Sequence, residues 1–86
     1  MTLIKSVVVV WTMPKLDLPE SCTTPLKQKL QEMALAGQTD GKAQWESNQI
    51  SMYFFTDQLS AEEFVDYLTS ALPCSAYIDS TKINTL

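Results

Sequence analysis

The chain has 86 residues, a length suited to one domain spanning residues 1–86, and ten Asp and Glu against six basic residues give it a net charge of −4. All six basic residues are scattered lysines, and Arg and His are absent. The composition therefore lacks the usual general acid/base, a leading metal ligand and the bidentate clamp for phosphate, and it offers no basic stripe for nucleic acid.

An apolar, β-branched segment near the start of the chain predicts a strand from about Leu3 to Met13. The strand is expected to end there because Pro14 lacks the amide hydrogen that would continue a ladder. Its most apolar run, Val7 to Trp11, is far shorter than the roughly 20 residues of a membrane span, and we see no secretory signal. We therefore expect no membrane partner and a cytoplasmic location, with a virus particle as a second setting.

A helix is predicted after a loop over residues 14–24. Thr24 can cap its first amides, Pro25 suits its first position, and Gly37 offers a left-handed stop after Ala36. One face of this helix carries the expected core stripe, which comprises Leu26, Leu30, Met33 and Ala34. Leu35 points away from that stripe.

The middle of the chain predicts a hairpin. Asp40-Gly41 is a turn signal, and the alternation from Lys42 to Ser47 predicts an edge strand with one wet face. The tripeptide Ser47-Asn48-Gln49 can reverse the chain directly into a strand from Ile50 to Phe55.

A second helix is predicted to start at Ser60, where Ser60 and Glu63 form a capping box and Leu59 packs on Phe64 as a hydrophobic staple. Pro73 is expected to stop it before a last, weakly patterned edge strand over residues 75–83. The buried stripe of this helix is expected to comprise Phe64, Leu68, Ala71 and Leu72, with Val65 beside it.

The order strand, helix, strand, strand, helix, strand predicts an α+β, ferredoxin-like βαββαβ fold. Its four-stranded antiparallel sheet has the first and third strands at the centre and the second and fourth at the edges. Right-handed crossovers place both helices on one face, so the opposite face lacks a cover.

The two central strands are apolar on both faces. We assign the more apolar set to the helix side, with Val9, Trp11, Met52 and Phe54 as its members. The open face and candidate interface is then formed by Val8, Val10, Tyr53 and Phe55. Exposed together, such side chains would make an apolar patch of the size that usually marks an interface.

The element order, the chain length and the stretch from Phe54 to Phe64 (FFTDQLSAEEF) resemble the dimeric α+β barrel proteins, a group that includes antibiotic-biosynthesis monooxygenases. The resemblance covers the whole chain as a pattern and implies that two open sheet faces pair into a barrel. Enzymes of the group use His, Asn, Trp or Arg in a pocket between sheet and helices. Here His and Arg are absent and Asn48, Trp11 and Trp45 match no family position, so the fold is implied rather than the activity.

Four side chains, Trp11, Met33, Trp45 and Met52, are candidates for lining a pocket for an apolar ligand, although core packing is the simpler explanation and the one we favour. Tyr53 and Phe55 could stack on RNA bases, but the charge has the wrong sign.

The carboxylates of Asp57, Glu62, Glu63 and Asp66 could hold a divalent cation, with a favourable helix dipole and a solvated face as the simpler explanation. Cys22 and Cys74 form no CxxC pair and are expected as free thiols, with a disulfide between them as the alternative.

Two functions follow from these patterns. The first is a non-enzymatic assembly module, without catalytic residues, metal or cofactor, that forms a homodimer or joins a larger protein assembly, a viral particle included, through its open face. The second is a cofactor-free monooxygenase or a binder of small apolar ligands in the dimeric barrel group.

Overall fold

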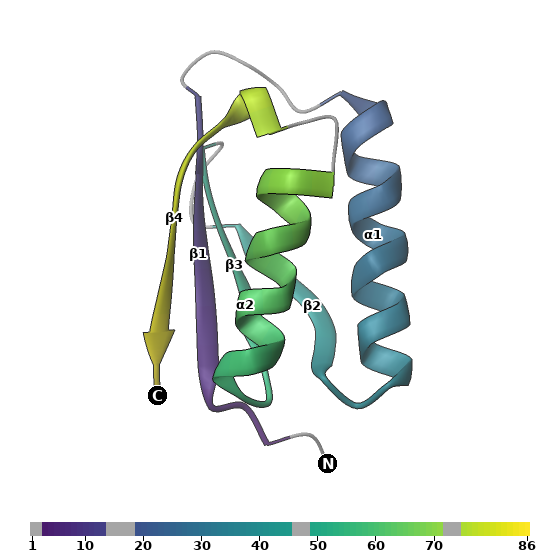
Figure 1. Ribbon diagram of the computed structural model, residues 1–86, viewed down its shortest axis with the longest axis vertical. Coiled ribbons are helices and arrows are strands. Elements are labelled where there is room, and N and C mark those ends of the chain that lie inside the picture. Colours follow the sequence, from purple (N-terminus) through teal and green to yellow (C-terminus); the bar gives the residue numbers. More distant parts are fainter. Residues whose placement is uncertain (1–2, 14–18, 46–48, 72–74) are drawn as a thin grey trace.

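Four antiparallel strands form one sheet in the order β2-β3-β1-β4, and two helices pack against it (Figure 1). The computed structural model describes residues 3–13, 19–45, 49–71 and 75–86. In chain order the elements are β1 (Ser6–Thr12), α1 (Glu20–Leu35), β2 (Thr39–Trp45), β3 (Ile50–Phe55), α2 (Gln58–Asp66), the π-helical turn η1 (Tyr67–Ala71), the 3-10 turn η2 (Ser75–Tyr77) and β4 (Ile78–Thr85). The predicted ferredoxin-like α+β fold is confirmed.

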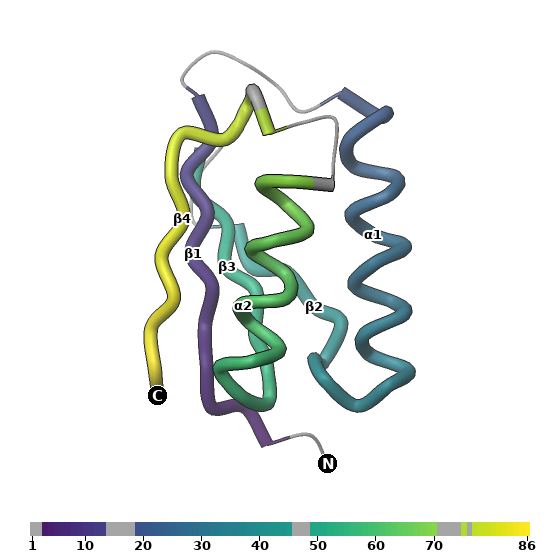
Figure 2. The backbone as a smooth tube through the Cα atoms, viewed as in Figure 1, coloured from purple at the N-terminus to yellow at the C-terminus, as the bar shows by residue number. Residues whose placement is uncertain are grey.

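The central strands are β1 and β3, as predicted, and they pair antiparallel with Val8 opposite Tyr53. The edge strands are β2, which pairs with β3, and β4, which pairs with β1. Both helices lie on the same side of this sheet: α1 contacts β2, and α2 contacts β1, β3 and β4. Figure 2 shows that α1 and α2 run in opposite directions. Lys29 of α1 contacts the turn that follows α2, because its Nζ lies 5.3 Å from the centre of the Tyr67 ring.

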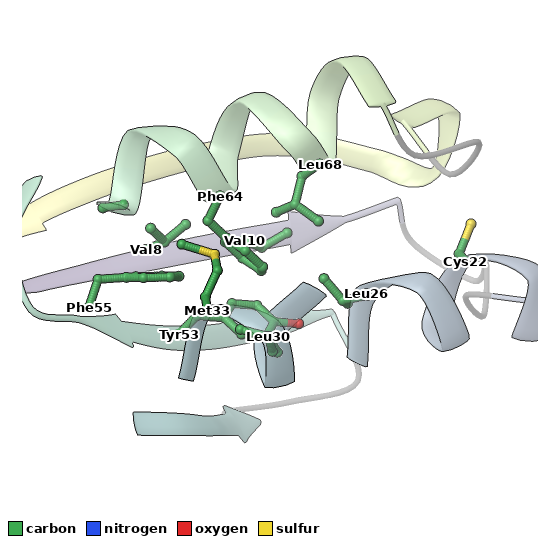
Figure 3. Packing of buried hydrophobic residues seen from close by; sticks show 11 residues of the cluster. Val8, Val10, Cys22, Leu26, Leu30, Met33, Tyr53, Phe55, Phe64 and Leu68 are labelled. Atoms are coloured by element: carbon green, nitrogen blue, oxygen red, sulfur yellow. The ribbon is translucent and has the colours of Figure 1, made fainter. Parts of the chain in front are cut away.

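The core fills the layer between the sheet and the helices (Figure 3). Its centre is an aromatic cluster, in which the Phe64 ring of α2 lies 4.8 Å from the Tyr53 ring and 5.0 Å from the Phe55 ring, centre to centre. Aliphatic side chains from both layers surround this cluster, and they include Val8, Val10, Leu26, Leu30 and Leu68. The buried stripe predicted for the first helix is confirmed at Leu26, Leu30 and Met33.

The predicted assignment of the two sheet faces is wrong. Val8 and Phe55 are fully buried, Val10 is 4% exposed and Tyr53 is 2% exposed, all beneath the helices rather than on the open face. Because alternate strand residues point to opposite sides, the set expected under the helices lies on the open side instead. That set comprises Val9, Trp11, Met52 and Phe54.

The two sets of strand residues were assigned to the wrong faces because the helix-covered set includes polar residues. Ser6 and Ser51 are each 1% exposed and share that side with the large aromatic rings. Their small size suits positions where helices lie close to the sheet, and Ser51 Oγ finds a partner 3.4 Å away in the Tyr53 hydroxyl. Apolarity alone favoured the other set, although a buried hydroxyl with a partner is well tolerated.

Helix α1 begins at Glu20, one turn earlier than predicted, with Pro19 at the N-cap position and Pro25 inside the helix. The additional turn brings Cys22 into the core at 1% exposure. At its other end the helix stops as predicted at Gly37, whose φ is 76°. The Gln38 amide donates to the Met33 carbonyl at 2.9 Å and the Gly37 amide to the Ala34 carbonyl at 3.0 Å, which is a Schellman motif.

Helix α2 is capped by Asp57 and not by the predicted capping box. The Asp57 carboxylate accepts a hydrogen bond of 2.7 Å from the Ser60 amide. Ser60 is therefore inside the helix and 4% exposed, while Leu59 is 77% exposed, so the predicted staple does not form. Glu63 accepts instead from Gln38 Nε2 at 3.2 Å, which ties the start of α2 to the end of α1.

The edge strands differ from their predicted bounds. Strand β2 starts at Thr39, and its pairing shifts between Thr39 and Ala43, so Gly41, with a φ of 75°, lies in an irregularity of the strand rather than in a preceding turn. Strand β4 runs from Ile78 to Thr85, later than the predicted range. The predicted reversal at residues 47–49, the helix stop at Pro73 and the side chains of Ala71 and Leu72 lie outside the described residues, Gln49 excepted.

Candidate interaction surface

The side of the sheet away from the helices carries three cross-strand pairs of apolar residues. In the β1–β3 register, Val7 is opposite Phe54, Val9 is opposite Met52 and Trp11 is opposite Ile50. Directly opposite residues share a face. These six side chains form what we call the open face: Val7, Val9, Trp11, Ile50, Met52 and Phe54.

Polar residues border the open face on both edge strands. On β4, Ser80, Lys82 and Asn84 are opposite Trp11, Val9 and Val7 in turn. On β2, Gln44 is opposite Met52. The surface therefore has an apolar stripe two strands wide between polar margins, which is the anatomy of a protein interface with an apolar centre and a polar rim.

The large side chains of the open face supply its accessible apolar surface. Val7 is 7% exposed and Val9 is 9% exposed although no helix covers them. Their neighbours Trp11, Met52 and Phe54 are half-buried, so these larger side chains carry more of the exposed apolar surface than the valines do. The helices lie on the opposite side of the sheet and do not cover these larger side chains.

Charge is distributed unevenly between the two sides of the molecule. Among the strand positions that the pairing aligns with the open face, Lys82 is the charged residue, and no carboxylate lies there. Five of the described acidic residues belong instead to the exposed surfaces of the helices, at Glu20, Glu32, Glu62, Glu63 and Asp66. Within the described strands, the six apolar residues of the open face therefore have no carboxylate among their aligned neighbours.

The four predicted pocket residues do not come together. Trp11 and Met52 lie on the open face, Met33 is 1% exposed in the core, and Trp45 is 53% exposed at the end of β2. Trp45 lines a different cavity, of about 80 Å³, between α1 and the β2–β3 side of the sheet. Its apolar walls are Leu26, Leu30, Ala43, Trp45 and Tyr53.

Two polar residues, Thr23 and Lys27 of α1, complete the lining of this cavity. The sequence analysis did not predict this cavity, although the pattern of the edge strand indicates one. Ala43 and Trp45 alternate on one face of the edge strand, and the small alanine leaves space beside the indole. Burial in the same region raises the pKa of the Tyr53 hydroxyl, an effect that the hydrogen bond from Ser51 opposes.

The carboxylates considered as a cation site have other partners. Asp57 caps α2, Glu62 accepts from Gln58 Nε2 at 3.2 Å, and Glu63 accepts from Gln38. Across residues 3–13, 19–45, 49–71 and 75–86, no three Asp, Glu, Cys or His side chains are grouped so that they could hold a metal ion.

The structure describes one of the two cysteines, Cys22. Cys22 is a free, buried thiol, as predicted, and burial raises its pKa. Cys74 lies outside the described residues. In the described part of the chain, no helix is both long and apolar enough to cross a membrane.

Comparison with known proteins leaves the site to be interpreted from its own geometry. No family model, curated protein or solved structure matches this chain. The resemblance to the dimeric α+β barrel proteins stays a prediction.

Proposed function

We propose that this chain is a non-enzymatic assembly module that pairs with a second copy of itself through the open face. The observation that carries the proposal is the apolar stripe of three cross-strand pairs, bordered by polar strands and lacking a covering helix. A larger assembly would be built from this pair.

The flat area of the open face is smaller than that of a standard interface, so the proposed pair is held by a small contact. With a rise of roughly 3.3 Å per residue and a strand spacing of roughly 4.8 Å, four strands of about seven residues present a face of roughly 23 by 19 Å. Stable interfaces bury roughly 800 Å² per partner, at the lower end roughly 600 Å². The chain exposes 5324 Å² in total, so covering this face would remove a considerable part of its surface from water.

A second copy suits the open face better than a polar partner does. Two sheets pack face to face at a spacing of about 10 Å only when both inner faces are apolar, and an identical chain supplies the same apolar stripe. A two-fold arrangement also uses the same residues on both chains, so a single patch is sufficient. Because no carboxylate lies on this stripe, pairing does not bring the chain's negative charges together there.

The test is the mass of the protein in solution. We expect analytical ultracentrifugation to show a dimer for the unchanged chain and a monomer for Met52→Lys, because a lysine at the centre of the stripe would have to be desolvated in the pair. Leu59→Lys is the matched control, since it adds the same charge at an exposed position of α2 and should leave the dimer intact. Circular dichroism should show that all three proteins are folded.

A second measurement does not depend on a substitution. Trp11 lies within the open face, so its fluorescence should move to shorter wavelength as the protein concentration rises and pairing covers the indole. A chain that sediments as a monomer at every concentration, or a Met52→Lys protein that remains a folded dimer, would refute the proposal.

A further inference from the structure

The cavity beside Trp45 lies on the helix side of the sheet and is separate from the open face. Its walls come from Leu26 and Leu30, one turn apart on α1, from Ala43 and Trp45 on β2, and from Tyr53 on β3. Figure 3 shows Leu26, Leu30 and Tyr53 together between α1 and the sheet.

Apolar walls make this cavity suitable for a hydrocarbon group. Its volume of about 80 Å³ is roughly half that of an engineered apolar cavity of about 150 Å³ that holds benzene. Such a space accepts a short segment of an alkyl chain, and the rest of a longer chain can extend along the exposed indole of Trp45, which is 53% exposed.

The polar groups of the lining determine which end group such a chain would carry. Lys27 is exposed on α1 and has no ion-pair partner within the described part of the chain, while the Thr23 hydroxyl already donates to the Glu20 carbonyl at 3.5 Å. Among the residues that the structure describes, no carboxylate lines the cavity. An anionic head group is therefore favoured next to Lys27, and a cationic one is not.

We propose that this cavity binds a linear aliphatic monocarboxylate, with the alkyl chain between Leu30 and Trp45 and the carboxylate at Lys27. The binding is non-covalent and does not require the open face, which lies on the other side of the sheet. Burial of each methylene group should strengthen binding by about fourfold until the cavity is filled, after which added methylenes should contribute less.

Octanoate, octanol and octylamine, each below its aggregation concentration, are the probes that test this proposal. Nitrogen–proton correlation spectra give one indole signal for Trp45 and one for Trp11, which a Trp45→Phe protein would assign. We expect octanoate to shift the Trp45 signal and leave the Trp11 signal in place, octanol to bind about tenfold more weakly, and octylamine not to bind. Hexanoate should bind more weakly than octanoate, and butyrate more weakly still.

Three variants isolate the parts of the site. Lys27→Met should remove the preference for octanoate over octanol, whereas Lys42→Met, at an exposed lysine outside the lining, should keep it. Ala43→Leu should fill the cavity and reduce the affinity for both probes at least tenfold, and an unchanged urea midpoint would show that the fold is intact. If Ala43→Leu unfolds the protein, Ala43→Val is the milder filling variant and should weaken binding in the same direction.

Several results would overturn the proposal. Equal affinity for octanoate and octanol in the unchanged chain would remove the role of Lys27. A shift of Trp11 instead of Trp45 would place the ligand on the open face, and the absence of any shift at millimolar octanoate would leave the cavity without a ligand of this class. None of these outcomes alters the dimer measurement, so the two proposals fail separately.

Discussion

The two faces of the central strands are both apolar, yet they differ in how they are covered. The helix-covered side places Tyr53 and Phe55 against Phe64 and includes the buried hydroxyls of Ser6 and Ser51. The open face has six apolar residues in three pairs and no polar residue between them. The more uniformly apolar side is thus the one that the chain leaves without a helix.

If the open face pairs as proposed, this difference divides the chain's apolar residues between folding and association. A closed core accepts polar side chains where they are small and hydrogen-bonded, since what it requires is filled space. A surface that joins two chains has to release water over a continuous area, which favours large apolar groups side by side. The contrast predicts different consequences for equivalent substitutions on the two faces.

The largest difference is expected between two adjacent phenylalanines that point to opposite sides. Phe55→Ala should lower the free energy of unfolding by about 3 to 5 kcal/mol, because it leaves a cavity beside Phe64. Phe54→Ala should cost less than half as much in dilute protein but weaken the dimer. Urea unfolding at several protein concentrations measures both quantities.

A matched control for this pair is Leu59→Ala at the exposed start of α2, which should change stability by less than about 0.5 kcal/mol. Equal losses for Phe54→Ala and Phe55→Ala at low concentration would mean that the two faces do not differ as described.

A smaller effect is expected when a hydroxyl replaces a methyl group in neighbouring valines. Val8 is fully buried beneath the helices, so Val8→Thr should lower the free energy of unfolding by about 1 to 3 kcal/mol by burying a hydroxyl away from water. Val9→Thr places the same group on the open face, where Val9 is 9% exposed and lies outside the helix-covered core, and should cost less, about 1 kcal/mol.

The same pair of variants should reverse its order in the dimer assay. Val9→Thr should lower the dimer affinity, because pairing would desolvate the new hydroxyl, and Val8→Thr should leave the affinity of the folded fraction unchanged. Sedimentation at matched concentrations of folded protein checks this, and an unaffected Val9→Thr dimer would contradict it.

Periodicity predicted the elements and their order but not which face the helices cover. The alternation in β1 and β3 defines two sets of side chains, and the side that receives the helices depends on how each crossover leaves its strand. Polar residues such as Ser51 lower the apolarity of a set without excluding it from the core, because Ser51 finds a partner in Tyr53. Ranking the sets by apolarity therefore gave the reverse answer.

The sequence predicted a helix end correctly where a single local signal was present. Gly37 alone offers a left-handed stop after the first helix, and the Schellman hydrogen bonds form there. At the second helix two good caps, Asp57 and Ser60, are three residues apart, and local rules favour either. Tertiary contacts decide in favour of Asp57, since Ser60 is then buried and its hydroxyl accepts from Gln38 Nε2 at 3.3 Å.

The candidate sites depended on these same contacts. The residues of the open face were all present in the predicted strands, and only their side of the sheet was wrong. The cavity beside Trp45 joins residues of α1, β2 and β3 that are distant in the sequence, and its existence depends on how far α1 lies from the edge strand. The spacing of residues along the sequence does not predict the distance between α1 and the edge strand β2.

The smallest predicted effect concerns acid, which should loosen the cover on the helix side without acting on the open face. The pKa of Asp57 is lowered by the hydrogen bonds from the Ser60 amide and hydroxyl, with a contribution from Lys5. Because the pKa is lower in the folded chain, the stabilising contribution of Asp57 is complete above the unfolded value of about 3.9 and is lost as the pH falls through the folded value.

Asp57→Asn separates this titration from the capping itself, since asparagine also accepts the hydrogen bond at an N-cap but carries no charge. The difference in urea midpoint between the unchanged chain and Asp57→Asn should therefore be largest near neutral pH and shrink as the pH falls below about 4. The two proteins differ only at residue 57, so the difference between them reports on that side chain. A difference that stays constant with pH would show that Asp57 does not act through its charge, whereas the dimer affinity, which depends on the opposite face, should be the same for both proteins.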